Sequence, residues 1–267
     1  MGHHKFLHEN HPFRFDVNKF GTPELRPAPT PLSGEEILEC SKDLSTVFGK
    51  DPSGKKPAHK RRKEGEPLVI FKRSIRFIFP YWKKLMLRHN FDVMHIGKNV
   101  DDNFVNTLLG TDGKSKDNLN SRLDLQALGI RTDLHPVEVE DQFYLPPAPY
   151  TMSPDEKKIF CQVMKGVKFP AGYASDIRHN VHVNERKIFG LKSHESHIIL
   201  QHLLPLAVRK ILPEIVCAAV IRVSNFFKKL GSPVIRISDM ESLEADIAET
   251  LSLLEVIFLL FSILWYT

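Results

Sequence analysis

Residues 91–136 read FDVMHIGKNVDDNFVNTLLGTDGKSKDNLNSRLDLQALGIRTDLHP, and this stretch decides the fold of the chain. After Asp92, apolar side chains recur every three or four positions, which predicts a helix with one apolar face. They are Val93, Ile96, Val100, Phe104 and Leu108. An aspartate in front of such a run is typical of a helix N-cap, because its carboxylate accepts hydrogen bonds from the free N–H groups of the first turn. The loop GTDGKSKDN then leads to a second short helix around 122–128.

The first of these helices also carries the first candidate site. Asp92, His95 and Asn99 are spaced at i, i+3 and i+7, so they share one helix face and could converge on a metal ion or a phosphate. A structural metal site normally needs four ligands, so an N-cap followed by a surface histidine explains the same residues. Gly97, inside this helix, costs about 1 kcal/mol relative to alanine.

Upstream, residues 1–32 are rich in His, Pro and Phe without any period, which predicts an extended, irregular arm. Its histidines could bind zinc, but no cysteine lies nearby and their spacing matches no zinc finger. They are His3, His4, His8 and His11. Ser33 and Glu36 then form a capping box, which predicts a short amphipathic helix running to Phe48 and closed by Gly49.

A basic run lies in the linker at 50–66, ahead of a predicted strand at 68–79. Such a concentration of charge cannot pack into a core, so it belongs to a solvated segment. It is either a nuclear import signal and phosphate-contacting patch or a linker that is merely soluble. The run consists of Lys55, Lys56, Lys60, Arg61, Arg62 and Lys63.

Downstream, residues 129–150 hold four prolines and predict an extended linker, after which Ser153 and Glu156 form a second capping box. The segment 176–187 suits a phosphate backbone, although a polar exposed loop explains it equally well. Its basic members are Arg178, His179, His182 and Arg186.

Beyond Leu191 the pattern predicts helix throughout. One helix is expected to be capped by Ser193, a second begins near Pro213, and a third follows a capping box from Ser238 to Glu241. The apolar stripe of the third helix fits packing inside this chain or against a partner helix in a coiled coil. That stripe is Leu243, Ile247, Leu251 and Leu254.

Composition narrows the class of protein. The chain has 267 residues and a formal net charge of +5, a mild basic bias that fits a nucleic-acid partner without requiring one. Three widely separated cysteines argue against a disulfide framework and for a reducing compartment. The apolar tail at 257–266 is too short to span a bilayer, which needs about 20 residues. The sequence has no Gly-rich phosphate loop and no recognisable nucleophile motif, so no small-molecule substrate is expected.

Several blocks resemble the C-terminal part of the En/Spm-like (CACTA) plant transposases, continuing into the plant domain of unknown function that follows the transposase core. The likeness extends from residue 2 to about 258, and its blocks keep the order of the family. They are GHHKFLHENHPFR (2–14), RPAPTPLSGEEIL (26–38), FPYWKKLMLRHNFDVMHIGKNV (79–100), TLLGTDGKSKDNLNSRLDLQALGIR (107–131), LPPAPYTMSPDEKKIFCQVMKGVKFPAGYASDI (145–177) and LKSHESHIILQHLLPLAVRKILP (191–213).

The resemblance implies an RNase H-like fold in which three carboxylates hold two Mg²⁺ ions for phosphoryl transfer. In the family the earlier carboxylates lie upstream of the first block, where this chain begins. The family motif DVMHIEKNV has a glutamate where this chain has Gly97. Asp92 and His95 are then remnants of the family motif, the acidic set is incomplete, and the chain is expected not to be an enzyme or to hold a cofactor. After Phe258 the sequence also departs from the family, as a frameshift or misplaced gene end would make it.

The expected architecture is mixed and mostly α: a partial RNase H-like α/β fragment followed by an incomplete helical domain. Its expected parts are an arm at 1–32, a core fragment at 33–135, a linker with one helix at 136–190, and a truncated helical domain at 191–267. The expected function is that of an inactive transposase remnant with residual DNA or protein binding, in the nucleus or otherwise the cytoplasm. The alternative is a domesticated protein-interaction module acting through the C-terminal helices, and membrane attachment is not expected.

Overall fold

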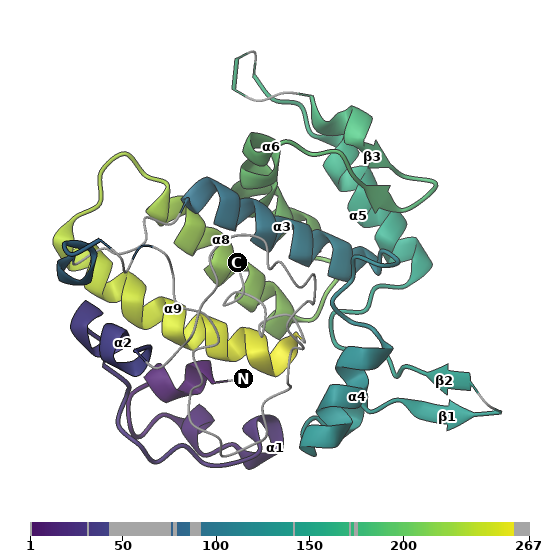
Figure 1. Cartoon of the computed structure of the whole chain (residues 1–267). Helices are drawn as coiled ribbons and strands as arrows, with labels where there is room; N and C mark the ends of the chain where they lie inside the picture. Colours follow the sequence, from purple (N-terminus) through teal and green to yellow (C-terminus); the bar gives the residue numbers. More distant parts are fainter. Residues whose placement is uncertain are drawn as a thin grey trace, which may run out of the picture. The chain divides into compact units, whose positions relative to one another are not determined.

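The computed structural model describes residues 2–30, 32–42, 76, 79–85, 92–140, 142–170, 172–173 and 176–258. These residues are mostly helical, with two small two-stranded sheets (Figure 1). The chain divides into two compact units, one made of Met1–Pro29 with Asp92–Thr267 and the other of Thr30–Phe91. The expected boundaries after 135 and 190 therefore fall inside the first unit.

The first unit contains most of the helices. Its longest are α3 (Val93–Leu109), α8 (Glu214–Leu230) and α9 (Ile237–Ile257). The shorter elements, in chain order, are η1 (His3–Phe6), η2 (Pro12–Arg14), α1 (Val17–Phe20), α4 (Leu119–Leu128), η5 (Thr132–Leu134), β1 (Val137–Val139), β2 (Gln142–Tyr144), α5 (Pro154–Gly166), η6 (Ile177–Asn180), β3 (Val181–His182), β4 (Lys187–Ile188), α6 (Ser193–Ile198), the π-helical turn η7 (Ile199–Leu203) and α7 (Leu204–Val208).

Helix α3 forms as its apolar spacing predicts. Val100, Phe104 and Leu108 are all buried in the core of this unit, and the helix ends at Gly110, whose left-handed φ of 61° favours glycine. The Phe104 ring meets the ring of Phe258 edge-on, with 5.3 Å between their centroids. Helix α6 packs on α3, as Figure 1 shows. Helix α3 therefore shares one core with α6 and with Phe258.

Helices α8 and α9 lie side by side (Figure 1), and the apolar stripe of α9 packs inside the chain. Leu254 is fully buried and Leu243 is also buried, while Leu251 packs against the core at its edge. On the outer side, the Arg222 guanidinium donates to the Glu249 carboxylate at 2.8 and 2.9 Å. Of the two readings of this stripe, packing within the chain is the one the fold uses.

Of the four predicted serine caps, two are confirmed and two are wrong. Ser33 and Ser153 each accept the N–H three residues on, and the glutamate there accepts the serine N–H at 2.7 Å. Helix α6 instead begins one residue early, because Glu195 accepts the N–H of Lys192 at 2.8 Å. Helix α9 begins at Ile237, so Ser238 lies within the first turn rather than before it.

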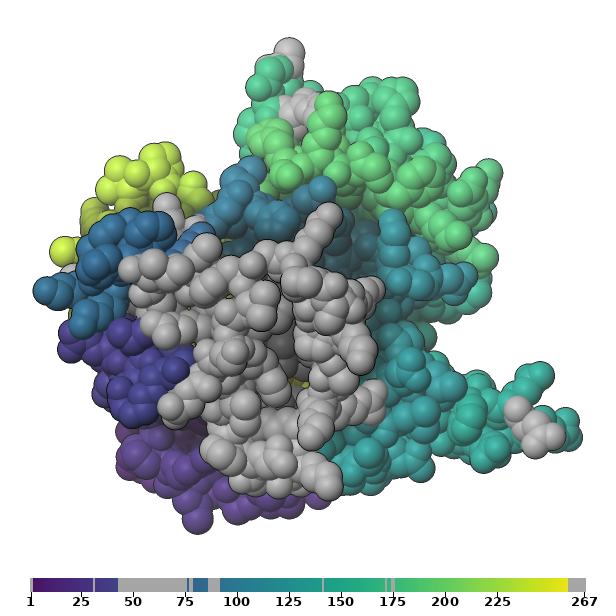
Figure 2. Space-filling view, in the orientation of Figure 1, coloured from purple at the N-terminus to yellow at the C-terminus, as the bar shows by residue number. Residues whose placement is uncertain are grey.

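The predicted linker at 129–150 is instead partly folded. It contains η5 and an antiparallel hairpin in which Val137 pairs with Tyr144 and Val139 with Gln142. Every residue of both strands is exposed, and the hairpin projects from the surface in Figure 2. Strands this short leave little periodicity to detect in a sequence with four prolines.

The N-terminal arm was expected to be extended and irregular, but it folds into short helical turns around one buried arginine. The Arg14 guanidinium, 1% exposed, donates to the carbonyls of Lys5 (2.9 Å), Leu7 (3.0 Å) and Glu24 (3.2 Å), and it also contacts the Arg26 carbonyl. Turn η1 packs on α9. The arm is therefore folded and packs against α9 of the first unit.

The second unit is described in part. Helix α2 (Gly34–Cys40) packs on the turn η4 (Trp82–Lys84), where a Cβ on Gly34 would lie 2.1 Å from the Lys83 carbonyl oxygen. The helix predicted to reach Phe48 ends at Cys40, because the Ser41 hydroxyl donates to the Leu38 carbonyl at 3.1 Å. The basic run at 55–63 and most of the strand predicted at 68–79 lie outside the described residues. At the end of that strand, Phe79 N–H donates to the Arg76 carbonyl in a turn.

Candidate functional site

Asp92, at the start of α3, uses its carboxylate as a helix cap. One oxygen accepts the N–H of Met94 at 2.9 Å and the N–H of His95 at 3.2 Å, while the His95 side chain is exposed. In the part of the chain that the structure describes, no group of three His, Cys, Asp or Glu side chains is placed to hold a metal ion. The interpretation of Asp92 as an N-cap is confirmed.

Gly97 lies where α3 and α6 approach most closely. A Cβ added there would lie 2.4 Å from His197 Cε1 and 2.6 Å from its Nε2, distances that real Cβ atoms essentially never show. The imidazole is 6% exposed and fixed at both nitrogens, by the Met94 carbonyl at 2.9 Å and by the Gln201 amide at 3.2 Å. The position at which the family resemblance places a glutamate is therefore filled by a buried histidine.

One turn further along the same face, Asp101 is completely buried. Its carboxylate faces the Ser196 hydroxyl of α6, and neither group has a further hydrogen-bond partner among the described residues. Burial raises the pKa of Asp101 well above its usual range, the charge of Asp102 adds to this effect, and Ser196 opposes it. Burial therefore disfavours the charged form of Asp101.

The other side of α3 forms a polar groove of about 590 Å³ with the loop after the helix and the segment from β4 to α6. Lysine and asparagine side chains dominate it, and together with one exposed aromatic ring they form what we call the α3 groove. Its side-chain lining includes Lys98, Asn99, Asp102, Asn103, Asn106, Lys114, Lys116 and Phe189.

The α3 groove carries a positive charge. None of the ammonium groups of Lys98, Lys114 and Lys116 forms an ion pair with a carboxylate that the structure describes, and Asp102 is the one acidic side chain in the lining. Burial raises the pKa of Asp102, while the nearby charges of Lys98 and Lys114 lower it. Three cations and at most one carboxylate make the groove attractive to an anion.

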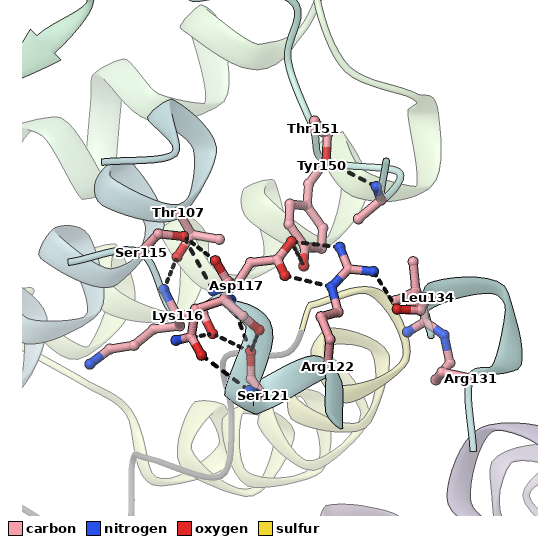
Figure 3. Close-up of polar contacts among 12 residues, drawn as sticks. Thr107, Ser115, Lys116, Asp117, Ser121, Arg122, Arg131, Leu134, Tyr150 and Thr151 are labelled. Atoms are coloured by element: carbon pink, nitrogen blue, oxygen red, sulfur yellow. Dashed lines mark hydrogen bonds and ion pairs between the residues drawn. The ribbon is translucent and has the colours of Figure 1, made fainter. Parts of the chain in front are cut away.

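A buried polar network fixes the loop that carries Lys114 and Lys116 (Figure 3). The Asp117 carboxylate accepts two bonds from the Arg122 guanidinium, at 2.6 and 2.7 Å, and one from the Tyr150 hydroxyl at 3.0 Å. Burial lowers the pKa of Arg122, but the hydrogen bond to Asp117 and the charges of Asp117, Tyr150 and Asp133 together outweigh it, and the net shift is upward. The lysines therefore project from a preorganised loop.

The backbone of Lys116 is bonded directly to α3. Its own N–H donates to the Thr107 hydroxyl at 3.2 Å, which ties the loop back to α3 (Figure 3). On the far side of the network, Arg122 also donates to the Leu134 carbonyl at 3.0 Å. The backbone of Lys116 is therefore fixed. Its ammonium group forms no ion pair with a carboxylate that the structure describes.

The polar segment at 176–187 contributes only in part. The Arg178 guanidinium is paired with Asp176 of its own turn, at 2.6 and 2.7 Å, so its charge is neutralised locally. His179 and Arg186 are exposed and do not line the α3 groove. His182 does not line the groove either, but its ring stacks on Phe189, which does, with 4.3 Å between centroids.

Each histidine of the arm makes a different contact. His3 Nδ1 meets a carboxylate oxygen of Glu255 at 2.8 Å, and His4 packs on the ring of Phe20 at 4.3 Å. His8 and His11 accept N–H groups of their own turns, from Asn10 and Phe13. They do not converge on a common centre.

Protein-family models, curated proteins and solved structures were compared with the chain, and none matches it. Within the described part, no helix combines the length and the apolar character needed to cross a membrane.

Sequence reasoning found the ends of the α3 segment but missed the groove beside it. Lys98, Asp102 and Asn106 recur every four residues, so a lysine- and amide-bearing helix face was visible in the sequence. Nothing in the sequence placed Phe189, more than 80 residues later by number, on the same groove.

Proposed function

We propose that this chain binds the phosphate backbone of nucleic acid through the α3 groove and does not cleave it. The observation that carries this proposal is a set of three lysines that line one groove with asparagine amides and form no ion pair with a carboxylate that the structure describes. Lysine and asparagine side chains are typical phosphate contacts. The net charge of +5 favours the same partner.

The absence of cleavage follows from the donor set on α3. A two-metal mechanism needs acidic side chains that converge on the ions. Asp92 uses its carboxylate to cap the helix, Gly97 has no carboxylate, and Asp101 is buried where its charged form is disfavoured. Descent from an En/Spm-like transposase, with residues 33–135 as a piece of an RNase H-like core, is part of this proposal and rests on the sequence resemblance.

Binding is tested by fluorescence anisotropy with a labelled oligonucleotide at several salt concentrations. The triple variant Lys98→Gln, Lys114→Gln, Lys116→Gln is expected to bind more weakly than the wild type. A matched control replaces three exposed lysines outside the groove, Lys158→Gln, Lys210→Gln and Lys228→Gln. Equal losses in both triple variants would show only a general charge effect and would count against the groove.

Cleavage is tested by plasmid nicking with Mg²⁺ or Mn²⁺. The wild type and Gly97→Glu are both expected to leave the plasmid intact, because a glutamate at 97 enters the space of the buried His197 ring. Robust nicking that is abolished by Asp92→Ala would overturn the proposal. In the cell, we propose that the basic run at 55–63 directs the protein to the nucleus, which mutation of that run should abolish.

A second candidate function is protein interaction through the C-terminal helices. Val234, Ile237 and Met240 are 81%, 82% and 57% exposed around the start of α9, and an adjacent groove of about 510 Å³ separates α8 from α9. Exposed apolar groups of this kind favour a partner surface. Ile237→Asp should dissolve a defined oligomer or complex seen by light scattering, and a monomeric wild type would count against this candidate.

A further inference from the structure

We propose that the nucleic acid bound in the α3 groove is single-stranded, with one unpaired base stacked on Phe189 and the neighbouring phosphates on Lys98, Lys114 and Lys116. This inference rests on the proposed function and specifies its ligand. Proteins that bind single strands combine a basic groove with an aromatic side chain on which a base stacks. The α3 groove brings both parts together in one place.

Phe189 is exposed yet rigidly held. Its ring is 46% exposed, while its backbone N–H donates to the Asn180 carbonyl at 3.2 Å and its carbonyl accepts the Asn180 amide at 3.0 Å. Gly190 follows with φ 78°, in the left-handed region that favours glycine, and turns the chain toward α6. A backbone fixed in this way limits the conformational entropy that is lost when a base stacks on the ring.

One ring of the protein already stacks on Phe189. The imidazole of His182 lies on the Phe189 ring with 4.3 Å between centroids and an interplanar angle of 2°. A base added to the exposed part of the ring would continue this parallel arrangement.

The groove wall also offers hydrogen bonds to base edges. Asn106 is 9% exposed and lines the groove, and its Oδ1 has no hydrogen-bond partner in the described part of the chain, while its Nδ2 donates to the Asp102 carbonyl at 2.7 Å. A buried acceptor without a partner is costly, so it suits a donor such as an exocyclic amino group. Asn99 and Asn103 lie on the same side of α3 with further amide groups.

The dimensions favour an unpaired nucleotide over a double helix. At about 590 Å³ the groove falls within the range of about 300–1,000 Å³ that holds a group of small-molecule size. In a duplex the faces of the bases are covered by their neighbours, so only an unpaired base can stack on a protein ring. Phosphate contacts alone would not distinguish the two forms.

The test compares a labelled single-stranded 12-mer with a duplex of the same sequence by fluorescence anisotropy. Phe189→Ala should weaken single-strand binding at least about fivefold, since one base–aromatic stack has about that value or more, and should leave duplex binding unchanged. Phe189→Tyr should retain wild-type affinity because it keeps a ring. Tyr144→Ala, which removes a 59% exposed ring outside the groove, is the matched control.

A direct readout of stacking uses 2-aminopurine in the single strand. Its fluorescence should change on binding to the wild type and to Phe189→Tyr, and the change should disappear with Phe189→Ala at saturating protein. An unchanged signal in Phe189→Ala, or equal affinity for duplex and single strand in every variant, would overturn the inference.

The outcomes separate this inference from the proposed function. Binding that is lost with the lysine triple variant but indifferent to Phe189 would keep the function and refute the stacked single strand. No binding to either form would refute both. Polyglutamate that displaces the oligonucleotide at equal charge concentration would also refute the inference, because it would show a site for anionic polymers without bases.

Discussion

At the scale of single residues, the most informative position is Gly97. Its missing side chain lets the His197 ring lie against α3 and bond to the Met94 carbonyl at 2.9 Å. A glycine inside a helix costs about 1 kcal/mol relative to alanine. The close packing of α3 on α6 offsets that cost, so the structure requires a glycine at this position.

Gly97→Ala and His197→Ala are therefore expected to be coupled. In the wild type, the added methyl group collides with the ring and overpacks the interface, which costs about 1–3 kcal/mol. In the His197→Ala background the collision is gone, and the same change should stabilise the protein by about 1 kcal/mol through helix propensity. Urea unfolding of the four proteins of this cycle measures the coupling, and additive effects would contradict the close approach.

Asp101→Asn tests the buried carboxyl. The pKa of Asp101 is raised in the folded protein by burial, whereas an unfolded aspartate titrates near about 3.9. Below that pH both states are protonated, and the full stability is present. As the pH rises toward the folded pKa, the unfolded state alone ionises and stability is lost.

The measurement is the free energy of unfolding of both proteins from pH 3 to pH 8. The free energy of unfolding of Asp101→Asn, relative to that of the wild type, should increase with pH above about 4. The increase should level off above the pKa of Asp101 in the folded protein. A difference that is independent of pH would mean that Asp101 titrates normally and is not buried as described.

At the scale of elements, local sequence signals predicted the start of a helix correctly at only some of the capping positions. The capping boxes at Ser33 and Ser153 formed as predicted, because a hydroxyl and a carboxylate three residues apart satisfy each other locally. Ser193 and Ser238 carried similar signals, but both helices begin earlier in the chain. The hairpin at 137–144 and the Arg14-centred arm were missed, because each depends on pairing or on carbonyls well separated along the chain.

The attachment of the arm to α9 predicts an acid-sensitive contact. Glu255 is 6% exposed and accepts the N–H groups of Gly2 and His3, at 3.1 and 3.2 Å. Burial raises its pKa, but the hydrogen bond and charge of His3, the Gly2 N–H and the N-terminal charge together outweigh burial, and the net pKa is lowered. The stability from a lowered carboxyl pKa is present above the unfolded value, near about 4.3, and is lost as the pH falls through the folded value.

Hydrogen exchange followed by mass spectrometry checks this contact. Peptides of the arm should be protected at pH 7 and exchange faster, after correction for intrinsic rates, as the pH falls below about 4. Glu255→Gln should expose the arm already at pH 7, with Glu249→Gln, which lies further up α9, as the matched control. Equal protection in both variants would contradict a specific role for Glu255.

At the scale of the whole molecule, the sequence predicted the class of structure better than its site. A mostly helical chain was expected and is observed, and α3 lies in the core as its apolar period indicated. The α3 groove could not be predicted, because it joins a helix face, a loop and the end of β4 that are distant in sequence. Only the lysine and amide spacing on α3 pointed toward it.

The central claim is that the α3 groove neutralises nucleic-acid phosphates. The most direct test is the slope of log K against log salt concentration for a single strand, where each phosphate contact contributes about 0.7. Replacing Lys98, Lys114 and Lys116 with glutamine should reduce that slope by about 2, while the matched triple variant of Lys158, Lys210 and Lys228 should leave it unchanged. The same slope in the wild type and the groove variant would contradict the claim.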